Sequence, residues 1–188
     1  KPILIIMMAL MAIALFAHSG SIGLRAEEPR RAVTGIETYL SGNLIVPQIH
    51  DCTYYNKPPL YNWILAGSIS IFNSMEEWAI RIPGILSVIL TALAIFYVSK
   101  RFVQHETAVL AALFYLTSAD LFFYGTVNAG EIDLFYSLIV TLQAFSIFLF
   151  HHKKKYGWLF LVSYFLAAVG TLTKGIPSVA FQGITLFA

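Results

Sequence analysis

The sequence predicts an all-α, polytopic membrane protein with amphipathic interfacial helices in its first outer loop. Of its 188 residues, 58% are hydrophobic and only 12% are charged, and the mean hydropathy is +0.73. A water-soluble domain rarely has so apolar a composition. A helix needs roughly 20 apolar residues to cross a hydrocarbon core about 30 Å thick. The segments that meet or approach this length are 2–18, 82–99, 107–127, 132–150 and 156–173, and a sixth, 176–188, begins at the end of the chain.

Composition and motif content exclude several other classes of protein. The net charge of +2 is too small to indicate nucleic-acid binding, and no basic stripe interleaved with aromatic residues follows a polar face. The single cysteine, Cys52, excludes an internal disulfide framework and a cysteine zinc site. Neither a Walker-type glycine loop nor a His-Glu-x-x-His motif occurs, so cytosolic nucleotide chemistry and zincin proteolysis lose support.

The two ends of the sequence indicate a fragment. The chain starts at Lys1 and stops at Ala188 inside an apolar run, so we expect it to be the N-terminal part of a longer protein. The segment 2–18 has a second interpretation as a cleavable signal sequence, because its short apolar run ends in the small residues Ala17 and Ser19. Both interpretations leave the following loop on the same side of the membrane.

Basic residues in short loops predict the orientation of the spans. Lys and Arg next to membrane segments are retained on the cytoplasmic side. Lys100, Arg101 and the basic run 151–155 mark that side, and they place the N-terminus there as well. The loop 19–81 and the turn 128–131 then lie on the outer face.

The outer loop is too long for a simple connector and carries two helical patterns of its own. Pro29 suits a first helical position and Gly42 the position past a helix end. Between them Ala32, Val33, Ile36, Tyr39 and Leu40 recur on one face, which predicts an amphipathic helix lying in the membrane interface. A second helix is predicted from the Pro58-Pro59 pair to about Asn73. Aromatic residues suited to the headgroup level, and candidate substrate contacts, are Tyr54, Tyr55 and Tyr61.

The start of the first interfacial helix concentrates charge. Glu27 and Glu28 precede Pro29, where unpaired amides and the helix dipole favour an anion. Simple capping is one interpretation of this acidic pair. Arg30 and Arg31 oppose the same dipole, so they need an anionic partner, which is either the two glutamates or a bound phosphate.

Further ionisable residues lie close to the predicted membrane surface. Lys57 precedes two prolines that stiffen its backbone, although snorkelling to headgroups is the alternative. Asp133 is one residue into an apolar run, where an ionisable group is a functional candidate, and Asp120 lies deeper in the third span. Lys174 and Arg81 are further candidate contacts to an anion. Such a mixture suits transfer from a lipid phosphate, because cations stabilise the leaving phosphate while a carboxylate takes the acceptor's proton.

Several sequence blocks in this order resemble a known family. They are Glu27-Glu28-Pro29-Arg30, SGNLIVP at 41–47, KPPLYNW at 57–63, AIRIP at 79–83 and LTKG at 172–175. The chain is similar to the start of glycosyltransferase family 39, the protein mannosyltransferase and aminoarabinose transferase (ArnT-like) group of GT-C membrane enzymes.

The resemblance implies a GT-C fold, a polyprenyl-phosphate-linked sugar as donor and inversion at the anomeric carbon. It implies that Glu27, or the adjacent Glu28, is the catalytic base and that Asp133 is a second catalytic acidic site. The candidate contacts to the donor phosphate are Arg30, Lys57, Arg81 and Lys174.

Two positions depart from the family pattern. Asn56 stands where ArnT-like members commonly have a glutamate that is associated with metal in some of them. A divalent metal therefore finds no support here, and no cofactor is predicted. Arg31 stands where a tyrosine often follows the family's arginine, which indicates a changed donor or acceptor preference.

We therefore predict a glycosyltransferase of the bacterial inner membrane that moves a hexose or pentose to an acceptor hydroxyl or phosphate on the outer face. Its expected partners are the polyprenyl-phosphate-linked sugar, a lipid or glycan acceptor and membrane lipid, without nucleic acid. Two other classes stay open. A lipid-phosphate carrier or flippase would need the cations but tolerate loss of Glu27 and Glu28, and a membrane scaffold would need neither.

Overall fold

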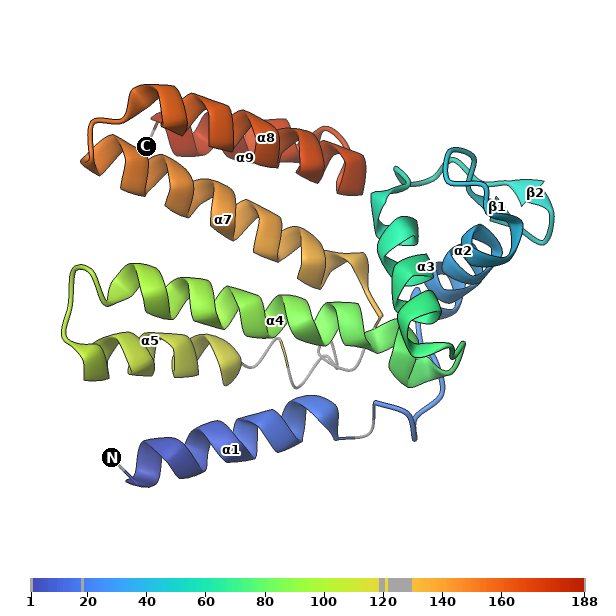
Figure 1. The fold of residues 1–188 in the computed structure, drawn as a ribbon, viewed down its shortest axis with the longest axis horizontal. Helices are drawn as coiled ribbons and strands as arrows, with labels where there is room; N and C mark the ends of the chain where they lie inside the picture. Colours follow the sequence, from blue (N-terminus) through green and yellow to red (C-terminus); the bar gives the residue numbers. More distant parts are fainter. Residues whose placement is uncertain (1, 18, 119–120, 122–129, 188) are drawn as a thin grey trace.

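The chain folds as a layered bundle of helices with a small cap at one end. This computed structural model describes residues 2–17, 19–118, 121 and 130–187. Helix α7 packs between α4 and α8, α5 packs on α4, and α9 packs on α7 and α8 (Figure 1). The elements are α1 (Pro2–Phe16), α2 (Glu28–Ser41), β1 (Gln48–Ile49), β2 (Cys52–Thr53), α3 (Leu60–Phe72), α4 (Glu77–Ser99), α5 (His105–Leu116), α7 (Ile132–His152), α8 (Tyr156–Lys174) and α9 (Pro177–Phe187).

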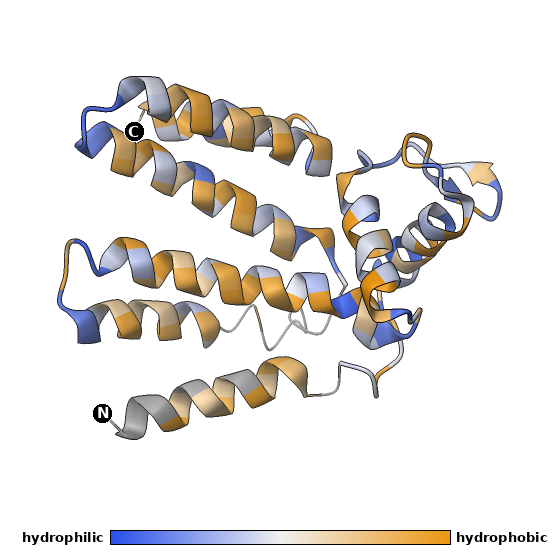
Figure 2. Cartoon of the chain, viewed as in Figure 1, coloured by the Kyte–Doolittle hydropathy of each residue, from blue (hydrophilic) through white to orange (hydrophobic). Residues whose placement is uncertain are grey.

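Three of the described helices are long and apolar enough to cross a membrane. They are α4 with 23 residues, α7 with 21 and α8 with 19. Figure 2 shows hydrophobic residues along these helices and hydrophilic residues at the α4–α5 and α7–α8 turns, at the end of the bundle away from α2 and α3. The predicted all-α polytopic fold is confirmed, with a two-stranded antiparallel ribbon of β1 and β2 added to the cap.

Helices α7 and α8 form a hairpin whose ends follow from local sequence. Helix α7 covers the predicted segment 132–150 and ends at His152, and α8 covers 156–173 and ends at Lys174. The turn between them places Lys154 in the left-handed region, with φ of 55°. Gly175, with φ of 86°, follows α8 and releases the chain from the helix.

Helix α4 begins five residues before the predicted start at 82, and it contains Pro83. A proline inside a helix removes the N–H that would bond the carbonyl four residues earlier. That carbonyl belongs to Ala79, and the Ser68 hydroxyl of α3 donates to it at 2.6 Å. The neighbouring helix thus satisfies the group that Pro83 leaves free, and α4 continues through the proline.

The structure describes the remaining predicted spans only in part. Helix α1 accounts for most of the segment 2–18 and α9 for most of 176–188. The predicted span 107–127 is described as helix α5, which begins at His105 and ends at Leu116. Asp120 and the turn residue Asn128 lie outside the described residues.

Helices α2 and α3 form the cap, which lies across the end of the bundle (Figure 1). Helices are present at both predicted positions, and α2 ends at Ser41 and is capped by Gly42, whose N–H bonds the Thr38 carbonyl. Gly35 of α2 is so close to α3 that a Cβ there would lie 2.7 Å from Leu65 Cβ. A core common to the cap, α4 and α7 is built from Ala32, Tyr61, Leu65, Ile69, Ile80 and Ile132.

The apolar residues of α2 that were predicted to lie in the membrane interface differ in their exposure within the protein. Ala32 is buried, but Tyr39 is 36% exposed and Leu40 is 67% exposed. The side of α2 that is buried in the protein contains two threonines and Gly35, and the lack of a side chain at Gly35 allows α3 to approach closely. Thr34 and Thr38 donate to backbone carbonyls of the preceding turn at 2.9 and 2.7 Å, so their hydroxyls are satisfied when buried.

Candidate active site at the capped end of the bundle

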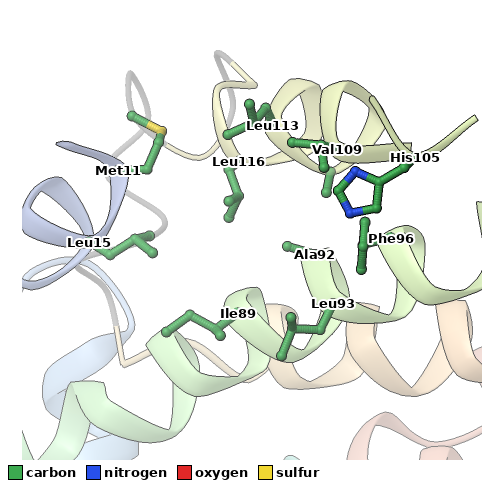
Figure 3. A pocket seen from close by; sticks show the side chains of 11 residues that line it. Met11, Leu15, Ile89, Ala92, Leu93, Phe96, His105, Val109, Leu113 and Leu116 are labelled. Carbon is green, nitrogen blue, oxygen red and sulfur yellow. The ribbon is translucent and has the colours of Figure 1, made fainter. Parts of the chain in front are cut away.

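An apolar cavity of about 420 Å³ between α1, α4 and α5 does not contain the predicted site residues. Figure 3 shows its lining, which includes Met11, Leu93 and Leu113. His105 is its one titratable lining residue in the described part of the chain, and its ring meets Phe96 edge-on at 5.5 Å. The charged candidates instead lie where the cap meets α4, α7 and α8.

A buried ion pair between Glu28 and Arg81 joins the cap to the bundle. Arg81 Nε donates to Glu28 Oε1 at 2.9 Å, and Arg81 Nη2 donates to Oε2 at 3.0 Å. Both side chains are 1% exposed. Because a buried charge is costly unless it is paired and hydrogen-bonded, such a pair requires further partners for its remaining groups.

Backbone groups supply those further partners. Arg81 Nη1 donates to the carbonyls of Ser19 and Ile22 at 2.8 and 2.7 Å. The N–H groups of Arg25 and Gly130 donate to the Glu28 carboxylate at 2.9 and 2.5 Å. One carboxylate thus connects the loop after α1, the start of α2, α4 and Gly130, two residues before α7.

This geometry favours a structural role for Glu28 and Arg81. The sequence indicated Arg81 as a phosphate contact and Glu28 as a catalytic group. Both side chains are instead buried and occupied by each other, which leaves no face for a ligand. The fixed carboxylate positions the first turn of α2, and the adjacent glutamate remains accessible.

Glu27 is the accessible member of the acidic pair. It is the N-cap residue of α2, and its side chain is 47% exposed. Arg30, one turn along the helix and 45% exposed, donates from Nη1 to Glu27 Oε2 at 2.7 Å. An exposed carboxylate and an exposed guanidinium therefore stand side by side, available to an acceptor hydroxyl and to a phosphate.

Asp133, 53% exposed, and Lys174, 29% exposed, form a second accessible pair on the same end of the bundle. Asp133 lies in the first turn of α7 and Lys174 in the last turn of α8, positions that the helix dipoles favour for these charges. The ammonium of Lys174 donates to Asp133 Oδ1 and lies 5.3 Å from the centre of the Tyr136 ring. Two predicted site residues 41 positions apart are thus in direct contact.

The remaining predicted residues lie before or within α3. Lys57 is half-buried and has no ion pair with any residue in the described ranges. Tyr55 is 72% exposed, and the Tyr54 hydroxyl accepts a hydrogen bond from Asn56 at 2.8 Å. Tyr61 is different, because it is 1% exposed and packs against the Phe135 ring at a centroid distance of 6.1 Å. Its position is in the core and not at the surface.

The part of the chain that the structure describes contains no group of three or more His, Cys, Asp or Glu side chains that could hold a metal ion. Asn56, at the position associated with metal in some ArnT-like proteins, bonds to Tyr54.

Glu131 and Arg31 lie close to the predicted site residues but were not among the predicted catalytic or phosphate-binding residues. Glu131 is the N-cap residue of α7 and is half-buried. Burial raises the pKa of its carboxyl above the usual value, the charge of Asp133 raises it further, and the charge of Arg31 opposes the shift. Arg31 is only 4% exposed. The available signal was the spacing of Glu131, two residues before Asp133 in the same polar turn.

Comparison with known proteins identifies the fold and the family. The profile of the dolichyl-phosphate-mannose-protein mannosyltransferase family matches residues 56–188, which include Lys57, Asp133 and Lys174. The chain belongs to this family. An undecaprenyl phosphate-alpha-4-amino-4-deoxy-L-arabinose arabinosyl transferase of Erwinia tasmaniensis is 30% identical over 166 residues, which cover 85% of this chain and 29% of the relative.

The mannosyltransferase-family fold also occurs in solved structures. The chain is similar to ArnT from Cupriavidus metallidurans in the apo state, with a TM-score of 0.85, 20% identity and coverage of 97% of this chain and 34% of that one. It is similar to the same protein bound to undecaprenyl phosphate, with a TM-score of 0.83 and 18% identity. The chain thus spans about a third of the length of these proteins, and it has the fold of their matching part.

Proposed function

We propose that the full-length protein is a membrane glycosyltransferase that moves a sugar from a polyprenyl-phosphate-linked donor to an acceptor hydroxyl or phosphate. The observation that carries the proposal is the pairing of solvent-accessible carboxylates with solvent-accessible cations at one end of the bundle, Glu27 with Arg30 and Asp133 with Lys174. The name of the Erwinia relative and the undecaprenyl phosphate bound to the Cupriavidus protein support this choice of donor.

In the proposed reaction, Glu27 acts as the general base. It accepts the acceptor's proton while the acceptor oxygen forms a bond to the anomeric carbon. The bond from that carbon to the phosphate oxygen breaks, and the polyprenyl phosphate leaves with the electron pair. A single displacement of this kind inverts the anomeric configuration.

The cations act on the leaving group. Arg30, Lys57 and Lys174 stabilise the charge that develops on the phosphate as the bond breaks. Because a glutamate with a reference pKa of about 4.3 is a modest base at neutral pH, positioning and charge stabilisation supply much of the rate. Asp133 holds the Lys174 ammonium in place and contributes a second carboxylate beside the reacting groups.

The proposal includes the orientation in the membrane. The basic turns Lys100–Arg101 and 153–155 lie at the end of the bundle opposite the cap (Figure 1). We place them on the cytoplasmic side of the bacterial inner membrane, with the N-terminus, because cytoplasmic loops retain Lys and Arg. The capped end with Glu27 and Asp133 then faces outward, where a lipid-linked sugar and an envelope acceptor meet.

Sugar transfer by the full-length protein in proteoliposomes tests the proposal. Glu27→Gln keeps the shape of the side chain but removes the base, so transfer should fall by about 10²- to 10⁴-fold. Glu106→Gln, an exposed glutamate on α5 at the opposite end, should leave transfer unchanged. Full activity of Glu27→Gln would contradict the assignment. Loss of transfer by both variants would show that the effect of Glu27→Gln is not specific to the base. Translocation of the donor without transfer by the unaltered protein would favour a carrier.

A further inference from the structure

The apolar cavity between α1, α4 and α5 lies apart from the candidate active site. Its volume is about 420 Å³, and every lining residue in the described part of the chain is apolar except His105. Figure 3 shows the side chains of α4 and α5 facing each other across this space, with Met11 and Leu15 of α1 beside it. Such a lining offers water no hydrogen bonds, and an empty cavity forfeits dispersion contacts, so the cavity favours a hydrocarbon occupant.

The two ends of the cavity have different surroundings. At one end Leu15 belongs to a buried core cluster, against which Ile89 and Leu116 also pack. At the other end are Phe96 of α4 and His105, the exposed first residue of α5. The rings of these two residues meet edge-on beside the α4–α5 turn, at the end of the bundle away from the cap (Figure 1). The cavity thus runs from the protein core to that surface.

The dimensions of the cavity match one extended hydrocarbon chain. Its α5 lining runs from His105 to Leu116, a rise of about 16 Å, which is close to the roughly 15 Å of hydrocarbon in one leaflet. A volume of about 420 Å³ over that length gives a mean cross-section of roughly 26 Å². A hydrocarbon chain packed at carbon–carbon distances of about 4 Å needs roughly 20 Å². An α-helix about 10 Å wide needs roughly 80 Å², so the cavity fits a lipid chain and not another helix.

A cation lies at the surface end of the cavity. The ammonium of Lys100 is 5.2 Å from the centre of the Phe96 ring, which lines the cavity, and 4.5 Å from that of the Tyr97 ring. Lys100 is exposed and has no ion pair with a carboxylate in the described ranges. The first turn of α5 has no side-chain cap from Gln104, so its N–H groups also favour an anion, although the Glu106 charge opposes this.

We propose that this cavity holds one acyl chain of an anionic phospholipid, with the phosphate of that lipid beside Lys100 and the His105 ring. The inference is independent of sugar transfer and concerns the end of the bundle opposite Glu27 and Asp133. The lysine supplies the attracting charge, and the imidazole can donate a hydrogen bond to a phosphate oxygen. Basic groups between membrane helices on the cytoplasmic side bind anionic headgroups in this way.

A bound chain also accounts for the space beside α1. Among the described residues, α1 has no extensive backbone contact with α4 or α5, although Met11 and Leu15 face the same cavity as Leu93 and Leu113. A hydrocarbon chain between these side chains supplies the dispersion contacts that the helices do not make with each other. The lipid therefore acts as packing between α1 and the α4–α5 pair.

Lipid binding by the full-length protein tests the proposal without turnover. Native mass spectrometry of the protein in mild detergent measures dissociation constants for added phosphatidylglycerol and phosphatidylcholine with identical chains. We expect the first phosphatidylglycerol to bind about fivefold more tightly than the first phosphatidylcholine, because the phosphate of a net anionic lipid lies beside one lysine. Equal binding of the two lipids by the unaltered protein would overturn the inference.

Two lysine variants test the position of the headgroup. Lys100→Gln should remove most of the preference for phosphatidylglycerol and leave binding of phosphatidylcholine unchanged. Lys153→Gln, which alters an exposed lysine in the α7–α8 turn, is the matched control and should preserve the preference. Equal losses in the two variants would indicate a general attraction by surface charge and would overturn the assignment to Lys100.

Two substitutions on α5 test the position of the chain. Ala112→Phe places a ring in the cavity, so it should weaken binding of the first lipid, whichever its headgroup, by about tenfold or more. Leu110→Phe enlarges a side chain that is 45% exposed and does not line the cavity, so it should bind lipid normally. Melting temperatures of both variants show whether either is misfolded. Unchanged binding by folded Ala112→Phe would contradict the proposal.

Crosslinking of the unaltered protein locates the chain even if Ala112→Phe does not fold. A phosphatidylglycerol with a diazirine in its acyl chain should label residues 89–96 or 105–116, which contain the α4 and α5 lining. Absence of label from both segments would show that another part of the full-length protein fills the cavity. Stronger binding of undecaprenyl phosphate than of phosphatidylglycerol, with loss of the label on its addition, would assign the cavity to a polyprenyl lipid and overturn the inference.

Discussion

At the scale of single residues, the two neighbouring glutamates of α2 have different surroundings. Glu28 is buried and bonded to Arg81 and to two backbone N–H groups, whereas Glu27 is about half exposed beside Arg30. The sequence places both at a helix start and gives no basis for separating them. The difference depends on Arg81, which is 53 positions away, and on the Gly130 backbone.

The buried pair predicts a large loss of stability when one partner is removed. Arg81→Met leaves the Glu28 carboxylate buried and without its main partner, which should cost about 3–5 kcal/mol. Thermal unfolding of the full-length protein in detergent measures the effect. Arg101→Met, an exposed arginine in the α4–α5 turn, is the control and should melt like the unaltered protein.

The Glu28→Leu/Arg81→Met double variant should be less destabilised than Arg81→Met alone, because no unpaired charge remains. Equal melting temperatures for Arg81→Met and Arg101→Met would show that the ion pair does not hold the cap on the bundle.

Glu131 predicts a dependence of stability on pH. Burial, followed by the Asp133 charge, raises the pKa of its carboxyl above the usual 4.5. A carboxyl group with a raised pKa stabilises the fold fully below its unfolded pKa, and this contribution is lost as pH rises through the folded pKa. The melting temperature of the unaltered full-length protein minus that of Glu131→Gln should therefore decrease as the pH rises from about 4 to about 7. A constant difference across that range would rule out this environment for Glu131.

At the scale of elements, the α2–α3 contact depends on one glycine. A Cβ at Gly35 would lie 2.7 Å from Leu65 Cβ, so Gly35→Ala must push the helices apart. Overpacking of this kind should cost about 1–3 kcal/mol. Gly67 on α3 is the matched control, since nothing lies within 4 Å of its added Cβ.

Gly67→Ala should be neutral or stabilising by up to about 1 kcal/mol, because alanine is the better helix former. Chemical denaturation of the full-length protein compares the two variants. If Gly35→Ala were no more destabilised than Gly67→Ala, close packing could not explain why the buried face of α2 is built from small residues.

The elements that sequence reasoning predicted well are those defined by local pattern. The apolar runs of α7 and α8 are bounded by basic residues and Gly175. The predicted ends of both helices therefore agree with the structure to within two residues. The start of α4 was not predictable, because its first turns bury Arg81 and rely on Ser68 of another helix beside Pro83. The buried face of α2 was missed because Gly35 and the threonines are not apolar markers.

At the scale of the whole molecule, the fold brings site residues from distant parts of the chain to one end. The charge types of Glu27, Arg30, Asp133 and Lys174 were evident in the sequence, and family resemblance supplied their expected roles. Glu27 and Arg30 pair within one turn of α2, whereas the Asp133–Lys174 pair required the packing of α8 on α7.

The central claim is that the capped end binds the donor phosphate and performs transfer. Sugar transfer from a polyprenyl-phosphate donor by full-length Lys174→Met measures it most directly, with Lys154→Met in the α7–α8 turn as the matched control. We predict that Lys174→Met lowers transfer by about 10²-fold or more through loss of charge stabilisation, with an unchanged melting temperature, while Lys154→Met transfers normally. Normal transfer by Lys174→Met, or an equal loss in Lys154→Met, would contradict the account.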